Sequence, residues 1–338
     1  MRVGNVIGSG KVYDYITGGQ ERATFSRAGV GGMKWFGGRG FSIEGYSPPG
    51  SPTTTNTLQY LSIGSGGTSV DFGDGTSGTD GASQCDGEAS DGIRMVIQPG
   101  YSVGAGGTPP EMQYFNGLVH SNAVDFGEMV ATTWPKGAAS NGNRVMSSAG
   151  DYTNRDTEFF NINTKADAVA SNDQAQDGAG RAAITDGHRG VFGGGRNGPG
   201  GFHDAMEYFQ IQNAYSGTDF SELATANYFF TTMSALGGRG LYLTGGQHPN
   251  TQIKAFNIST LASAFDFGEM EHVQAGGAGS SDGIRGHSSG AHGLAGDWGT
   301  PTAASVQYVN IYTRGNAVDY GEQVPGIYAQ QSRGGSSA

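Results

Sequence analysis

The chain is built from a repeat whose period limits the folds open to it. Each repeat begins with an aromatic residue, followed by two variable positions and usually by Ile; in one repeat Ala255 takes the first position and the aromatic residue follows it. The repeats start at Tyr13, Tyr60, Tyr114, Phe159, Tyr208, Ala255 and Tyr308. These starts lie 45 to 54 residues apart. Leucine-rich and β-helix repeats are much shorter, whereas a blade of a β-propeller has this length.

A second marker follows at a fixed distance of eleven residues and reads Asp-Phe-Gly-Asp or a close variant. Its first residues are Asp71, Asp125, Asp219, Asp266 and Asp319. The same offset gives Thr24-Phe25-Ser26 in the first repeat and Ala170-Ser171-Asn172 in the fourth, where the marker has decayed. The Asp-Phe-Gly turn of protein kinases needs companion motifs that are missing from this chain. We therefore interpret the marker as a turn that closes one strand and opens the next.

A third marker places a cation after an Asp-Gly or Asn-Gly pair, as in Ser90-Asp91-Gly92-Ile93-Arg94. Such pairs are typical of two-residue hairpin turns with positive φ at both central positions. The recurring cations are Arg94, Arg144, Arg189, Arg239 and Arg285, with Arg2 and Lys34 as further members by position. We expect these cations to pair with acidic or carbonyl groups of the Asp-Phe-Gly-Glu turn. The rival hypothesis is a functional basic ring in a central channel.

Each repeat thus predicts about four short strands, which agrees with 62 glycines in 338 residues and with few charged residues. Paired glycines and the absence of Trp-Asp pairs favour a kelch-like β-propeller over a WD40 propeller. We expect an all-β single domain over residues 1–338. Seven markers predict seven blades, and six is the alternative if the first repeat is an N-terminal extension.

The last repeat begins at Tyr308, only 30 residues before Ala338, which is too short for four strands. The apolar stretch within residues 1–10 offers the missing strand. We expect this N-terminal strand to complete the last blade, which would join the two ends of the chain and leave no open sheet edge.

Charge and composition narrow the function classes. The net charge is −11 and no basic stripe is visible, so we expect no nucleic-acid partner. The sequence has no run of 18 apolar residues, so we expect no membrane insertion. Cys85 is the only cysteine, which excludes an intramolecular disulfide. Two Gly-x-Ser-x-Gly stretches, 279–283 and 286–290, lack the strand-to-helix turn of a nucleophile elbow. We expect no catalytic, cofactor-binding or metal site, and hence no enzyme.

The loops between repeats differ most in length. The longest run from Lys34 to Tyr60 and from Arg285 to Tyr308. Because these loops join equivalent strands, they should emerge on one face of a disc. Aromatic residues on Pro-containing loops suit docking to a protein or a glycan. The candidate docking face is Phe41, Tyr46, Tyr101 and Trp298; the alternative is that these loops only pack on their own blades.

The combination of Y-x-x-I, D-F-G-[DE], S-[DN]-G-x-R and a Gly-Gly strand resembles repeats in virion proteins of tailed bacteriophages, especially phages of marine cyanobacteria. The resemblance spans nearly the whole chain but concerns a structural unit. It implies a non-enzymatic structural component of the virion, in a tail, a fibre or the capsid surface. Its partners would be other virion proteins. The alternative is a host-attachment module that binds a host surface protein or a glycan.

Overall fold

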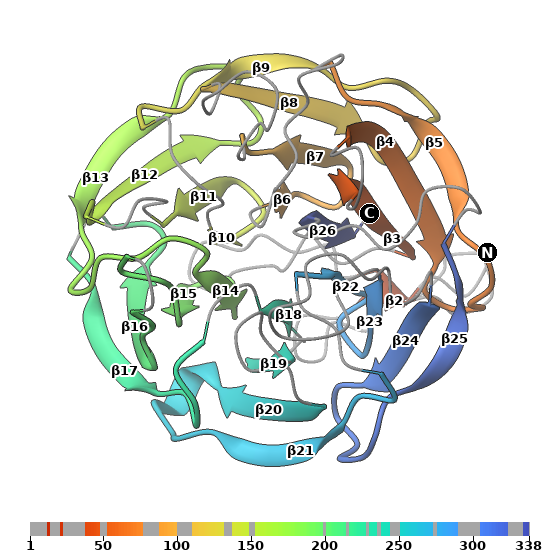
Figure 1. Cartoon of the computed structure of the whole chain (residues 1–338). Coiled ribbons are helices and arrows are strands. Elements are labelled where there is room, and N and C mark those ends of the chain that lie inside the picture. Colours follow the sequence, from red (N-terminus) through yellow and green to blue (C-terminus); the bar gives the residue numbers. More distant parts are fainter. Residues whose placement is uncertain are drawn as a thin grey trace.

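Six four-stranded antiparallel sheets are arranged as the blades of a β-propeller around a central axis (Figure 1). The structure is a computed structural model. It describes residues 12–13, 21–22, 38–47, 53–76, 88–99, 110–131, 137–148, 153–198, 201–213, 216–227, 230–234, 238–243, 251–272, 276–289, 305–323 and 334–337. The one helical element in these residues is a single 3-10 turn, η1 (Ile258–Thr260).

The blades are numbered here from the first along the chain, and their strands from the axis outward. The first contains β26 (Gly334–Ser337), β3 (Arg39–Ser47), β4 (Thr53–Ser62) and β5 (Val70–Asp74). The second contains β6 (Glu88–Ser90), β7 (Arg94–Ile97), β8 (Glu111–Asn116) and β9 (Val124–Glu128). The third contains β10 (Ala138–Ser140), β11 (Arg144–Ser147), β12 (Asp156–Asn161) and β13 (Val169–Asp173).

The fourth blade contains β14 (Ala182–Thr185), β15 (Arg189–Gly193), β16 (Ala205–Gln210) and β17 (Thr218–Glu222). The fifth contains β18 (Thr231–Ser234), β19 (Arg239–Leu243), β20 (Gln252–Asn257) and β21 (Phe265–Glu269). The sixth contains β22 (Ala278–Ser281), β23 (Arg285–Ser289), β24 (Ser305–Asn310) and β25 (Val318–Glu322). In every blade the first-named strand lies nearest the axis and the last lies on the rim (Figure 1).

The core lies between the blades. Phe41 on the second strand of the first blade packs edge-on against Phe115 on the third strand of the second blade, with ring centroids 5.2 Å apart. Phe72 of the Asp-Phe-Gly marker joins the same cluster, 5.1 Å from Phe41. Edge-on aromatic pairs stabilise beyond their buried area. The third strand and the marker of one blade therefore bind it to its neighbour.

The Asp-Phe-Gly marker is part of the outer strand, as in β5 and β9, so the expected turn between two strands is wrong. The ladder to the third strand shifts its register at the marker. Gly127 has φ 151°, and a Cβ there would come within 2.5 Å of the carbonyl oxygen of Ala166 in the next blade. A side chain is excluded by this close approach of two backbones. The glycine of the marker is thus a contact between blades.

The Asp-Gly turns join the inner strand to the second strand, but through three residues where two were expected. In the second blade the loop is 91–93, and Gly92 alone has a positive φ, at 88°. Asp91 Oδ1 accepts hydrogen bonds from the backbone N–H groups of Ile93 (2.9 Å) and Arg94 (2.7 Å). The aspartate side chain closes the turn in place of a second residue with positive φ, as in other Asx turns.

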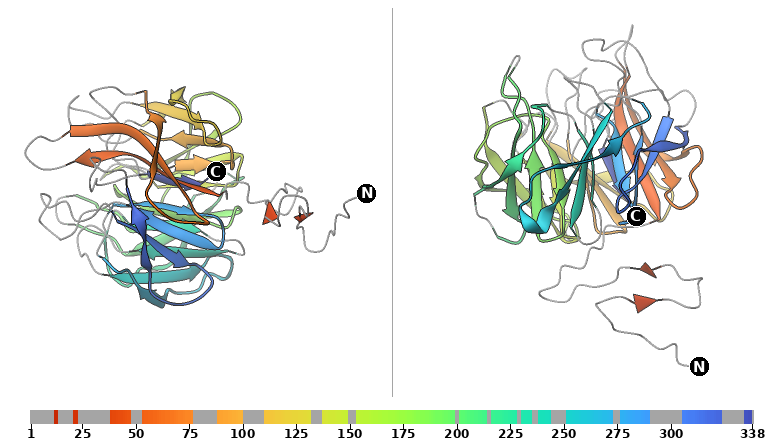
Figure 2. Two further views of the ribbon diagram at one scale, coloured as in Figure 1. Left: turned by 90° about the vertical axis from the view of Figure 1, so that its right-hand side faces the viewer. Right: turned by 90° about the horizontal axis from the view of Figure 1, so that it is seen from below.

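The expected count of seven blades is wrong, and the alternative of six is confirmed. The first aromatic marker, Tyr13, belongs to β1 (Val12–Tyr13), which pairs only with β2 (Glu21–Arg22). Figure 2 shows this small sheet apart from the disc. Residues 1–37 therefore precede the first blade and add no seventh one.

The expected closure also differs. The sixth blade takes all four strands from residues 278–322, so it needs nothing from residues 1–10, which lie outside the described residues. The inner position of the first blade is filled by β26, in which Ser336 pairs with Phe41. A repeat that starts at the aromatic residue begins on a third strand. The last repeat therefore supplies β26 as the inner strand of the first blade, and the one strand that it lacks is the second strand of that blade, β3.

Candidate functional site

Six arginines, each the first residue of the second strand of its blade, form a ring of links between blades. Each Nη1 donates a hydrogen bond to a carbonyl group at the end of the third strand of the next blade. Arg94 reaches Ile162 (3.1 Å), and Arg285 of the sixth blade reaches Gly64 of the first (3.0 Å). The full set is Arg39, Arg94, Arg144, Arg189, Arg239 and Arg285. The links run once around the disc and close on themselves.

These partners differ from the expected ones. The arginines bind carbonyl groups, as one branch of the hypothesis proposed, but on the Y-x-x-I strand and not on the Asp-Phe-Gly-Glu turn. Arg2 and Lys34 lie outside the described residues, and the sixth member is Arg39. The sequence held a signal for it, because Gly38-Arg39-Gly40 repeats Gly238-Arg239-Gly240.

The aspartates of the second marker are exposed on the outer strands. They are Asp71, Asp125, Asp219, Asp266 and Asp319. Asp125 forms an ion pair with Lys165 at 2.6 Å, and Asp266 with Arg314 at 3.5 Å. Exposed pairs of this kind contribute little to stability. In this marker the Phe and the Gly pack between blades, whereas the Asp faces solvent.

A second set of links uses the residue before the aromatic marker on the third strand. Its side-chain oxygen accepts a hydrogen bond from the loop that leaves the outer strand of the preceding blade. Gln113 Oε1 accepts from the N–H of Thr76 (2.6 Å), and Gln307 Oε1 from that of Glu271 (2.7 Å). Glu158 and Glu207 act in the same way. In the fifth blade this residue is Lys254, whose ammonium group cannot accept a hydrogen bond and forms an ion pair with Asp266 at 3.6 Å.

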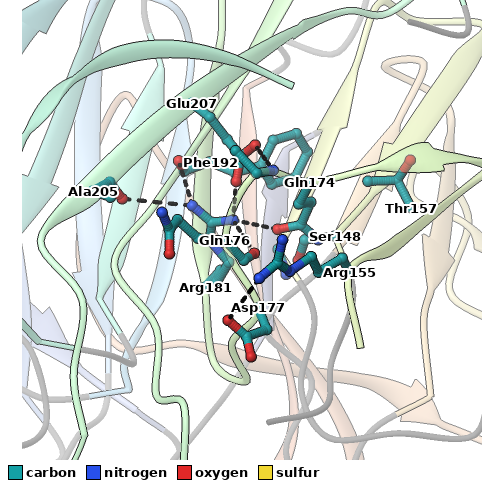
Figure 3. Close-up of polar contacts among 12 residues, drawn as sticks. Ser148, Arg155, Thr157, Gln174, Gln176, Asp177, Arg181, Phe192, Ala205 and Glu207 are labelled. Carbon is teal, nitrogen blue, oxygen red and sulfur yellow. Dashed lines mark hydrogen bonds and ion pairs between the residues drawn. The ribbon is translucent and has the colours of Figure 1, made fainter. Parts of the chain in front are cut away.

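The fourth blade adds a buried cation to this second set of links. Arg181 lies just before β14 and is fully buried. Its Nη1 contacts the carboxylate of Glu207 and the side-chain oxygen of Gln174, and its Nη2 donates to the carbonyl of Phe192 at 3.3 Å (Figure 3). The other oxygen of Glu207 accepts from the N–H of Ala175 at 2.7 Å. The guanidinium is therefore enclosed by protein groups from the third-to-fourth blade connection and from the fourth blade.

This cluster could not be found from the repeat. An arginine stands directly before the inner strand in one other blade, as Arg333 before β26, and Arg333 lies outside the described residues. Burial, assisted by the charge of Arg181, lowers the pKa of nearby His203. The enclosure of Arg181 indicates a structural role at this seam.

A serine and a histidine meet at the seam between the sixth and first blades. Ser280 Oγ lies 3.0 Å from His287 Nδ1, and both residues are buried. Burial, with a smaller contribution from Arg285, lowers the pKa of His287 to about 3. A Ser–His contact can activate a nucleophile. Here the pair packs against Gly40 of the first blade, where a Cβ would collide with both side chains, so the pair is part of the contact between the two blades.

The candidate docking face is altered by the structure. Phe41 is 1% exposed and belongs to the core between the first two blades, so it is no docking residue. Tyr46 lies on β3, where the ladder continues to the pair Ser47–Thr53. The β3–β4 hairpin is thereby longer than its equivalents, which have strands of four to six residues. Tyr101 and Trp298 lie outside the described residues.

The exposed apolar side chains of the described residues gather on the opposite face. We call this the lower face; it is formed by the turns between inner and second strands and the loops between third and outer strands. These turns and loops expose Ile93, Leu118, Val119, Leu261, Ile284 and Tyr312. The outer strands begin at the same face with Val70, Val124, Val169, Phe265 and Val318. The sequence markers did not reveal this face, because these residues occupy variable positions within a marker, as Ile93 does, or lie beside one.

Among the described residues, no three side chains of His, Cys, Asp or Glu come together as a group that could hold a metal ion. None of the helical structure described is long and apolar enough to span a membrane. Comparison with the known protein families and with curated proteins finds no match to this chain.

Proposed function

We propose that this protein is a kelch-like, non-enzymatic docking propeller of a phage particle. The repeat markers support this proposal through their resemblance to virion proteins, and the proposed place is the virion, in a tail, a fibre or the capsid surface. The proposed partners are other virion proteins.

The observation that carries the proposal is how the repeated polar side chains are used. The six arginines link each blade to the next, and the buried Gln and Glu side chains of the third strands hold the connecting loops. The Asp-Gly turns bind their own backbone. Repeat-fixed polar groups are therefore engaged in holding the disc together, which favours a scaffold whose specificity lies in the features that differ between blades.

We call the face opposite the lower face the upper face; the hairpins between second and third strands end there. Among the described strands, the β3–β4 hairpin of the first blade is longer than its equivalents in the other blades, and it carries Tyr46. A backbone held in a strand ladder loses little conformational entropy on binding. We place the docking surface on this hairpin and on the segments of the chain that contain Tyr101 and Trp298.

The first test is to locate the protein. Particles of the encoding phage are purified on a density gradient and the chain is quantified by mass spectrometry. A constant number of copies per particle supports the proposal. A chain found only in the soluble fraction of infected cells contradicts it.

The second test separates structural docking from host attachment. Tyr46→Ala and Trp298→Ala phages are compared with Tyr312→Ala, which removes an exposed aromatic residue from the lower face. The proposal predicts fewer copies per particle for the first two variants alone. Normal particles that no longer adsorb to host cells would favour the attachment module instead. Hydrolysis of host polysaccharide by the pure protein would overturn both.

A further inference from the structure

The second blade has the most apolar part of the lower face. Ile93 and Leu118 are each 50% exposed and Val119 is 60% exposed. The three are neighbours, since the N–H of Gly117 donates to the carbonyl of Ile93 at 2.8 Å. We call Ile93, Leu118 and Val119 the second-blade patch. The third blade has Asn143, Asn163 and Thr164 at these positions, so the patch is not a property of the repeat.

The N-terminal segment, residues 1–37, joins the disc beside this patch. It leads into Gly38, whose carbonyl accepts a hydrogen bond from the N–H of Ile63 at 2.9 Å. The next residue, Arg39, donates to the carbonyl of Gly117 at 2.9 Å. Gly117 directly precedes Leu118 and Val119. The segment therefore starts at the edge of the patch, and both views of Figure 2 show β1 and β2 on this side of the disc.

The charge of the segment is opposite to that of the disc. Residues 1–37 contain five of the 19 basic residues and two of the 30 acidic ones, a net charge of +3. The other residues consequently carry −14. Near the lower face, the outer strands of the first two blades expose Asp71 and Asp125. A basic segment tethered here is attracted to the surface from which it starts.

The small sheet of the segment needs a surface to pack on. β1 and β2 contribute two residues each, and a lone two-stranded ribbon is marginal in water. The tether keeps the effective concentration of the segment at the patch high, so even a weak contact would be populated.

We propose that residues 1–37 fold back and pack on the second-blade patch of their own disc. The segment covers Ile93, Leu118 and Val119, and its basic side chains lie near Asp71 and Asp125. This contact is independent of what the upper face binds.

The five basic residues of the segment make trypsin a probe of the contact: Arg2, Lys11, Arg22, Arg27 and Lys34. The full chain with Leu118→Ser and Val119→Ser is compared with the unchanged chain by mass spectrometry of early peptides. The proposal predicts that cleavage within residues 1–37 becomes about tenfold faster, because proteolysis follows the population of the open form. The matched control is Val130→Ser, since Val130 is also 60% exposed but follows the outer strand at the other end of the second blade. It should leave cleavage unchanged.

Salt gives a second, variant-free measurement. Raising NaCl from about 0.05 M to about 0.5 M screens exposed charges and should speed cleavage of the segment in the unchanged chain. Unfolding midpoints of all variants are measured in parallel, so that faster cleavage from a destabilised disc is recognised by new cuts at Arg94 or Arg285. Equal cleavage of the segment in all chains would overturn the proposal. Protection that rises with protein concentration would also overturn it, in favour of a contact with a second copy.

Discussion

At the seam between the third and fourth blades the buried polar group is a guanidinium, whereas at the seam between the sixth and first blades it is an imidazole. Arg181 is matched by the carboxylate of Glu207 and by carbonyl oxygens. His287 has the hydroxyl of Ser280 on one nitrogen, and its buried Nε2 has no hydrogen-bond partner among the described residues. A buried charge needs a compensating charge, while a buried histidine can shed its proton.

The comparison teaches that one repeat can bury polar groups in two ways with different weaknesses. The charged seam is vulnerable to loss of one partner. The neutral seam is vulnerable to acid. The remaining links, arginine to carbonyl, are the same at both seams and provide an internal reference.

The largest effect is expected from Glu207→Ala, which leaves the buried Arg181 without its carboxylate. Breaking a buried pair in this way costs about 3–5 kcal/mol of unfolding free energy. Chemical denaturation followed by circular dichroism measures it. The control is the double variant Arg181→Leu with Glu207→Leu, which should recover much of the loss. If the single and double variants lose equal stability, the pairing is not what holds this seam.

The next effect is a pH dependence at the other seam. The pKa of His287 in the folded chain, about 3, lies below the ordinary value of 6.5 in the unfolded chain. As the pH falls, the unfolded state therefore binds a proton before the folded state does. The contribution of the neutral His287 to the stability of the folded chain is full above pH 6.5 and falls as the pH drops from 6.5 towards 3. Between pH 7 and pH 5 the loss reaches at most about 2 kcal/mol.

The variant His287→Leu tests this origin of the pH dependence, with Leu241 of the fifth blade as precedent at the same repeat position. Unfolding free energies at pH 7 and pH 5 should differ less in the variant than in the unchanged chain. A slope that is the same in both chains would assign the acid sensitivity to other groups.

The smallest effect is expected from the shared links. Arg144 and Arg285 each donate from Nη1 to one carbonyl in the next blade, at 3.2 Å and 3.0 Å, and both side chains are partly exposed. Replacing either by Ala should cost about 1 kcal/mol, the usual net value of one hydrogen bond. Thermal unfolding of the two variants should give matching shifts. A loss for Arg144→Ala as large as that for Glu207→Ala would break the distinction between shared and special links.

The blade itself could be predicted from the sequence because each marker has a local cause. The aromatic marker is a buried third strand, and the Asp-Gly pair closes a turn through its own side chain. The Asp-Phe-Gly element, expected to be a turn, is part of the outer strand. The number of blades could not be read from the markers alone. Tyr13 looks like the start of a repeat, but β1 and β2 do not join the disc.

Partners across the seams were beyond the sequence for a physical reason. An arginine and its carbonyl lie about one and a half repeats apart in the chain, as Arg94 and Ile162 do, and carbonyl groups leave no trace in the sequence. The inner strand β26 is Gly-Gly-Ser-Ser and has no apolar pattern. Arg181 shares its position only with Arg333, so it is not part of any of the three markers. His287, however, could have been inferred to be buried, because its repeat position is Val96 or Leu241 in other blades.

Lys254 makes the fifth blade unlike the four blades whose third strand provides a side-chain acceptor at this position. The joint between the fourth and fifth blades is held by another side chain, because the Tyr242 hydroxyl of the fifth blade contacts the carbonyl oxygens of Ala182 (2.9 Å) and Val191 (3.2 Å) of the fourth. A mechanical consequence follows from the closed ring of links. Opening any one joint would turn the disc into a curved strip with a defined beginning and end, although the intact disc has neither.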